Sequence, residues 1–185
     1  MQRLFLQEDL HKFLESRKRE IKSFVESYDS DELLKADEEW CQSLIERFRL
    51  KAPAILEDEI GTEEPKRYSK DEEIKIIVPF EGDARLLEYR PSQWEATLPS
   101  AEIRGQELIL AYKITEHDPD KLRDQIQRDV AAIKRHMSWI KEDVDKFNAS
   151  LEGYVKDLVS KRKEEISNIK ELVTGLGFPV RRKKL

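Results

Sequence analysis

The chain has 185 residues and a formal net charge of -5, and 39% of its residues are charged while 38% are hydrophobic. This balance suits one small core with long solvated helices that bury a single stripe, and it argues against a large globular interior. A net negative field repels phosphates and anionic lipid at long range, so a general nucleic-acid-binding protein is disfavoured.

The cysteine content and the N-terminus bear on the cellular compartment. Cys41 is the only cysteine, which excludes an intrachain disulfide and a zinc site with several cysteines and favours a reducing compartment. Its acidic neighbours and Trp40 indicate a small core residue instead of a nucleophile. The N-terminus turns acidic at Glu8 and Asp9, and no apolar run approaches the roughly 18 residues of a membrane span. We therefore expect a cytoplasmic protein with no membrane segment.

The first region, residues 1–52, is predicted to be a helical hairpin. Apolar residues at helical spacing predict one helix over residues 4–28. Asp29 or Ser30 caps a second helix that runs to about Leu50, and Pro53 ends the pair.

The second region, residues 53–117, changes to a period of two and predicts an antiparallel sheet. An acidic loop over residues 55–71 comes first. Residues 74–80 then alternate as a strand and return through Gly82 into residues 85–89, and a second hairpin pairs residues 101–104 with 107–114. The expected result is a small sheet of four antiparallel strands in an α+β protein.

The third region, residues 118–177, predicts a long coiled-coil-like helix. Asp118 can cap it and Pro119 fits its first position. Its apolar residues step by threes and fours, the spacing that keeps one narrow stripe facing a partner. The stripe consists of Ile126, Val130, Ile133, Met137, Ile140, Val144, Phe147 and Leu151. Asn148, Ala149, Ser150 and Gly153 leave open a break into a helical hairpin.

This stripe is the best-defined feature of the sequence, and it is a packing device. It extends beyond what a sheet of short strands covers, which favours association with another helix or a second copy, most simply as a dimer. Arg162 and Glu165 interrupt the pattern, so the segment from Ile166 onward is expected to be a separable distal part.

Two other functions stay open as alternatives. Glu73 and Lys75 on one strand, with Asp58 upstream, resemble the two carboxylates and lysine of a metal-dependent nuclease or phosphodiesterase.

No cofactor or metal site is expected, because the three histidines lie on separate segments without a second ligand at metal-binding spacing.

The other alternative is a nucleic-acid-binding module. It would use the basic tail of residues 178–185 together with cations of the long helix. These residues are Arg181, Arg182, Lys183 and Lys184 in the tail and Lys134, Arg135 and Lys141 in the helix.

Several sequence blocks are similar to a poorly characterised group of bacterial proteins. The blocks are Leu33-Leu34-Lys35-Ala36-Asp37-Glu38-Glu39-Trp40-Cys41, Tyr89-Arg90-Pro91-Ser92, Trp139-Ile140-Lys141-Glu142-Asp143-Val144 with Phe147-Asn148, and Leu176-Gly177-Phe178-Pro179-Val180-Arg181-Arg182. In that group the segment precedes a separate effector domain, and some members belong to antiphage or conflict systems. The resemblance implies a regulatory or scaffolding part of a bacterial defence protein, with an effector domain beyond Leu185. It supplies no catalytic residues.

Overall fold

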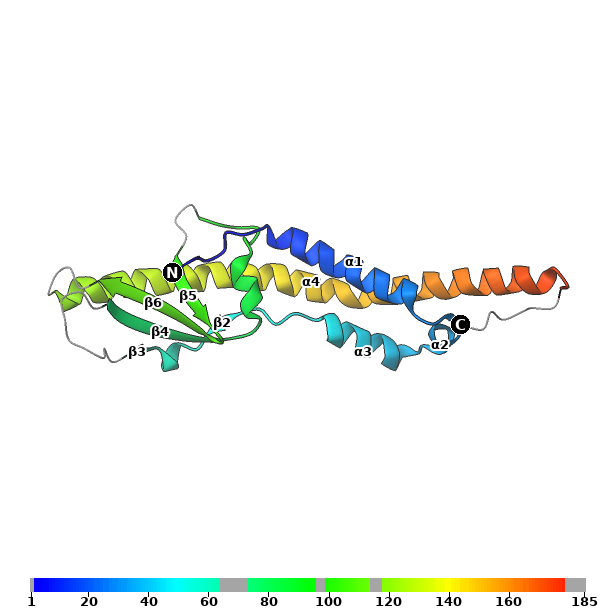
Figure 1. The fold of residues 1–185 in the computed structure, drawn as a ribbon, viewed down its shortest axis with the longest axis horizontal. Helices are drawn as coiled ribbons and strands as arrows, with labels where there is room; N and C mark the ends of the chain where they lie inside the picture. Colours follow the sequence, from blue (N-terminus) through cyan, green and yellow to red (C-terminus); the bar gives the residue numbers. More distant parts are fainter. Residues whose placement is uncertain (1, 64–72, 96–98, 114–117, 179–185) are drawn as a thin grey trace. The chain divides into compact units, whose positions relative to one another are not determined.

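The computed structural model describes residues 2–63, 73–95, 99–113 and 118–178, and its α+β architecture confirms the predicted fold class (Figure 1). The chain forms two compact units. The first combines Met1–Leu14 with Leu50–Phe147, and the second combines Glu15–Arg49 with Asn148–Leu185. These units interleave along the sequence, unlike the linear division into regions that the patterns predict.

The C-terminal helix α4 is continuous from Pro119 to Gly175 and has 57 residues. Its predicted start is confirmed, because Asp118 Oδ1 accepts hydrogen bonds from the backbone N–H groups of Asp120 (3.1 Å) and Lys121 (3.2 Å). The alternative helical hairpin is wrong. A single glycine weakens a helix without ending it. Gly153 lies in open surroundings, where an added Cβ would meet no atom within 4 Å.

The first unit contains an antiparallel sheet built around the hairpin of β5 (Ser100–Arg104) and β6 (Glu107–Lys113). The strand order is β1-β5-β6-β4-β2, with β1 at Gln2–Arg3, β4 at Glu73–Glu81 and β2 at Ala54–Ile55. The short strand β3 (Gly61–Glu63) also pairs with β4. The antiparallel sheet is confirmed, but three of its short strands carry too little alternation to be predicted.

One predicted strand is wrong. Residues 85–89 lie mostly in η2, a 3-10 helix over Ala84–Glu88. The Asp83 side chain caps this turn by accepting from the backbone N–H of Arg85 at 3.1 Å. Leu86 and Leu87 are both buried, which a strand with one solvated face does not allow for neighbouring residues.

The core of the first unit lies between the sheet and the N-terminal half of α4. Alternate residues of β4 face this core, with Ile76 opposite Leu110 and Val78 opposite Leu108 on β6. The Tyr112 hydroxyl donates to Asp129 Oδ2 of α4 at 2.9 Å, which ties β6 to the helix. The loop after η2 is also fixed to α4.

Residues of that loop make polar contacts, some of them from two of the sequence blocks named above. Ser92 donates from its backbone N–H (2.8 Å) and its hydroxyl (2.7 Å) to the Asp143 carboxylate of α4. Gln93 donates to Glu142 at 3.1 Å. Arg90 pairs with Asp9, which precedes α1 (Leu10–Ser27). Residues of the Tyr89-Arg90-Pro91-Ser92 and Trp139–Val144 blocks therefore link this loop to α4 and to the start of α1.

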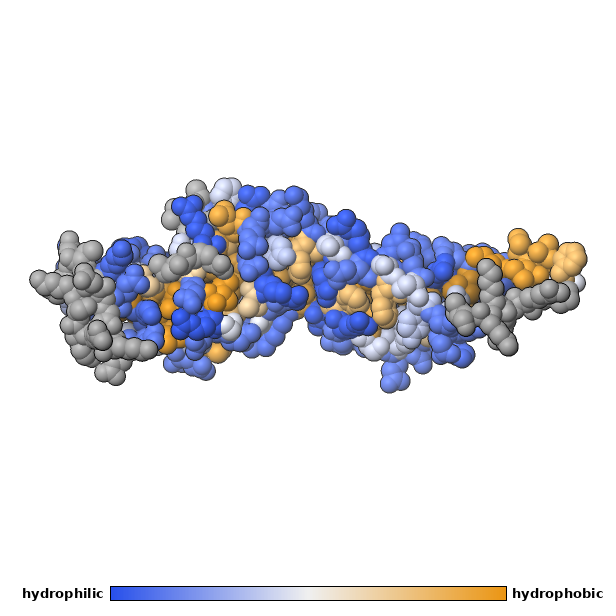
Figure 2. Space-filling model, viewed as in Figure 1, coloured by the Kyte–Doolittle hydropathy of each residue, from blue (hydrophilic) through white to orange (hydrophobic). Residues whose placement is uncertain are grey.

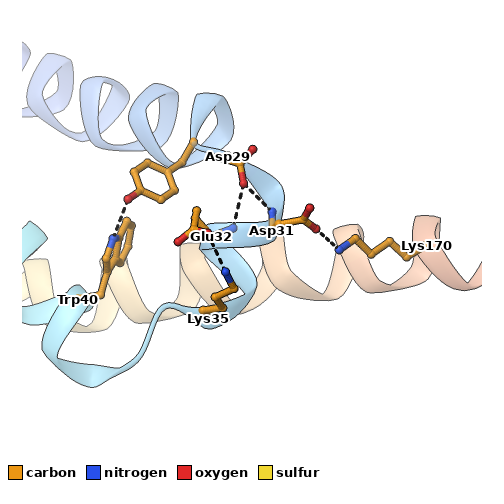
Figure 3. A network of polar contacts seen from close by, with 7 residues as sticks. Asp29, Asp31, Glu32, Lys35, Trp40 and Lys170 are labelled. Carbon is orange, nitrogen blue, oxygen red and sulfur yellow. Dashed lines mark hydrogen bonds and ion pairs between the residues drawn. The ribbon is translucent and has the colours of Figure 1, made fainter. Parts of the chain in front are cut away.

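The second unit packs three helices on the C-terminal half of α4. They are the C-terminal part of α1, α2 (Ser30–Lys35) and α3 (Glu38–Phe48). The predicted cap at Asp29 is confirmed, since its carboxylate accepts from Asp31 and Glu32 (Figure 3). The single helix expected over residues 30–50 is wrong, because Asp37 caps a new helix by accepting from the Trp40 N–H at 2.9 Å. Helix α1 likewise begins at Leu10, not at residue 4.

A candidate interaction surface at the end of α4

The predicted stripe is covered by the chain itself. Six of its members are buried, while Ile126 and Val130 are half-buried. The buried members are Ile133, Met137, Ile140, Val144, Phe147 and Leu151. The inference that this stretch needs a partner helix is therefore wrong, because sheet, loop and α1–α3 residues of the same chain supply the cover.

The apolar pattern continues past this cover to the end of α4, where its side chains meet solvent. We call this surface the distal face, and it appears as the hydrophobic group at the end of α4 in Figure 2. It consists of Ile169 (60% exposed), Leu172 (68%), Val173 (37%), Leu176 (60%) and Phe178 (78%). Isolated exposed apolar residues are common in proteins, whereas contiguous exposed apolar groups are candidates for binding a partner.

The distal face repeats a face of the same helix that is partly or fully buried farther back. Leu172 lies 18 residues after Tyr154, and Val173 lies 18 residues after Val155. Because an α-helix has 3.6 residues per turn, 18 residues are five full turns, so each pair points in the same direction. Tyr154 faces α1, since its hydroxyl donates to the carbonyl of Lys18 at 3.1 Å. Val155 is fully buried. The distal face thus points to the side of α4 that α1 contacts at Tyr154.

The cover stops because α1 ends. Helix α1 terminates at Ser27, nine residues after Lys18, which is about 14 Å of helix. Leu172 lies 18 residues beyond Tyr154, about 27 Å along α4. The chain instead turns at Asp29 into α2, where Asp31 pairs with Lys170 (Figure 3). The distal face therefore projects beyond the end of α1.

The predicted interruption at Arg162 lies inside the second unit. Val159 is buried, whereas Leu158, which the regular spacing places in the stripe, is only half-buried. The stripe therefore drifts by one position before Ile166, which is buried. Between Val159 and Ile166, Arg162 donates to Glu165 at 2.9 Å.

The residues expected for a nuclease are not assembled. Lys75 pairs with Glu63 across β3 and β4 at 3.7 Å. Gly61 lies opposite Ile77, and Leu56 donates to the Pro79 carbonyl, so Asp58 lies beside the second half of β4. Glu73 begins that strand, about 13 Å from residue 77 at 3.3 Å per residue. These two carboxylates cannot bind one metal ion, whose bonds are about 2.0–2.6 Å long.

The cations expected for a nucleic-acid-binding module have acidic partners where they are described. Lys134 pairs with Glu57, Arg135 pairs with Glu95, and Lys141 pairs with Asp145. Arg181, Arg182, Lys183 and Lys184 lie outside the described residues.

Cys41 and His136 both lie in the core. Cys41 is buried, and this burial raises the pKa of its thiol, which keeps it protonated and unreactive. The His136 ring is fully buried between Phe5 and Trp139, and its Nδ1 lies 2.9 Å from the Ala132 carbonyl. Within the described ranges, no group of three or more histidine, cysteine or carboxylate side chains could hold a metal ion.

None of the helices in the described part of the chain is both long enough and apolar enough to cross a bilayer. Comparisons of the chain with protein-family models, with curated proteins and with solved structures gave no match. The distal face is therefore described from the exposure and spacing of its own residues.

Proposed function

We propose that the chain is a non-enzymatic interaction module that self-associates as a dimer through the distal face. The observation that carries the proposal is the exposure of a helix face whose equivalent five turns earlier contacts α1 at Tyr154 and is fully buried at Val155. A second copy presents the same heptad-like face, so it offers the side-chain spacing that packs between helices.

The size of the distal face fits a weak dimer. The exposed fractions of its five side chains correspond to about 600 Å² per copy, or about 1,200 Å² for two copies, the lower limit for specific interfaces. Interfaces of this size form transient complexes, so we expect a monomer–dimer equilibrium in the micromolar range or weaker.

The proposal includes a biological setting. The resemblance to bacterial conflict-system proteins supports a regulatory or scaffolding part of a defence protein, in which association of two modules brings two effector domains together. The cytoplasm is the compartment that fits a single buried thiol. The nuclease and nucleic-acid alternatives have less support, since their described residues are separated or ion-paired.

The test is analytical ultracentrifugation of the wild type and two variants between about 1 µM and 1 mM, the range of weak complexes. Leu172→Asp places a charge on the distal face and is expected to weaken the dimer at least tenfold. Thr174→Asp is the matched control, because it adds the same charge to the same exposed turn about 160° around the helix from Leu172. A wild type that stays monomeric throughout, or equal weakening by both variants, would overturn the proposal.

A further inference from the structure

We infer that the two copies pair in an antiparallel manner, tip to tip, with the twofold axis near Leu172 and Val173. This inference deepens the proposed function and rests on it. Its basis is the contrast between the distal face, which is open, and the same face farther back along α4, which α1 already occupies.

Helix α1 blocks a parallel pair. Two contacts give the course of this part of the chain: Lys18 of α1 bonds to Tyr154, and farther along Asp31, just after the end of α1, pairs with Lys170. Helix α1 therefore runs in the same direction as α4 in this unit (Figure 1). A parallel partner that packs on Leu172 would place its own residues 148–166 in the space where α1 contacts Tyr154.

An antiparallel partner avoids this space. Its α4 approaches from beyond Phe178, overlaps only the last turns and leads away from the α1 helices of both copies. Within the overlap, the partner helix takes the place that α1 would occupy if it continued past Ser27. The short α1 thus determines both where the second copy binds and in which direction.

The two arrangements juxtapose different residues. With the axis between Leu172 and Val173, Ile169 of one copy faces Leu176 of the other. The two Ile169 residues are then offset by seven residues, about 10.5 Å along the helix. A disulfide requires Cα atoms within about 7 Å, so this offset prevents a bond between them. In a parallel pair, each residue faces its own equivalent.

The experiment is oxidative cross-linking of two single-cysteine variants, Ile169→Cys and Leu176→Cys, in full-length chains that also carry Cys41→Ala. The variants differ in an added tag, so that homodimers and heterodimers separate on a gel. Circular dichroism and sedimentation confirm that each variant is folded and associates. We expect the mixture to give at least tenfold more heterodimer than either variant gives homodimer.

The possible failures are distinguishable. Efficient homodimers from each variant alone, without heterodimer in the mixture, would overturn the antiparallel inference but leave the dimer in place. Dimers in sedimentation that give no disulfide in any combination would place the contact elsewhere and overturn it as well. A wild type that remains monomeric at every concentration would overturn the proposed function itself.

Discussion

Truncating leucines at two places on α4 should separate folding from association. Leu151 is fully buried in the second unit, while Leu172 is 68% exposed. Leucine to alanine removes about three carbon groups worth about 0.8 kcal/mol each when buried. The cavity that remains adds a further cost, so Leu151→Ala should lower the free energy of unfolding by about 3 kcal/mol. For Leu172→Ala only the third of the side chain that is covered contributes, so the free energy of unfolding should fall by at most about 0.8 kcal/mol.

The assay is urea unfolding followed by circular dichroism at about 1 µM protein, where a weak dimer is dissociated. Sedimentation at high concentration then measures association of the same variants, and Leu172→Ala should weaken it while Leu151→Ala should leave it intact wherever the variant is folded. Equal losses of unfolding free energy at the two positions would refute the reasoning, because they would mean that the end of α4 is covered within the monomer.

Other predictions concern the features that hold the fold together. Gly82 has φ +101° and a Cβ there would lie 2.4 Å from the Ala52 carbonyl oxygen, whereas Gly105 has φ +62° and open surroundings. Thermal unfolding should therefore show a loss of about 1–2 kcal/mol for Gly105→Ala and a clearly larger loss for Gly82→Ala, and the reverse order would contradict this explanation. Asp143→Ala removes both acceptors of Ser92, in the loop after η2, and should cost about 1–2 kcal/mol in urea unfolding; a change below about 0.3 kcal/mol would show that the loop is held by other contacts. Burial, followed by the hydrogen bond to Asp129, raises the pKa of Tyr112 above its ordinary value near 10. The stability contributed by the protonated phenol is then complete below pH about 10 and is lost as the pH rises toward the folded-state pKa, so Tyr112→Phe should have a smaller decrease in Tm between pH 9 and pH 11 than the wild type, and identical decreases would contradict the assignment.

The elements with strong local signals could be predicted from the sequence. The start of α4 was predictable because Asp118 and Pro119 precede a long periodic segment, and the β5–β6 hairpin because Gly105 permits its tight turn. The cap at Asp29 was predictable for the same local reason. The equivalent signal at Asp37, which is followed by two acidic residues, could have located the start of α3.

The rest depended on tertiary contacts. The two-residue strand β1 has no period, and its position depends on pairing with β5. The spacing of Ile133 and Leu151 predicted a covered stripe, but spacing is the same whether the cover is a sheet, a helix of the same chain or a second copy. Only the end of α1 at Ser27 shows which part of the stripe is left open. The apolar surface that α4 leaves open is therefore at its end and not in its middle.

The most direct test of the distal face is a methyl NMR dilution series. Isoleucine, leucine and valine methyl groups are labelled, and their shifts are followed from about 1 mM to about 10 µM, across the expected dissociation constant. We predict that the methyl signals of Ile169, Leu172, Val173 and Leu176 move together along one binding curve, while those of Ile133 and Leu151 stay fixed. Concentration-dependent shifts at Ile133 with none at Leu172, or no shifts at any of these methyl groups, would contradict association through the distal face.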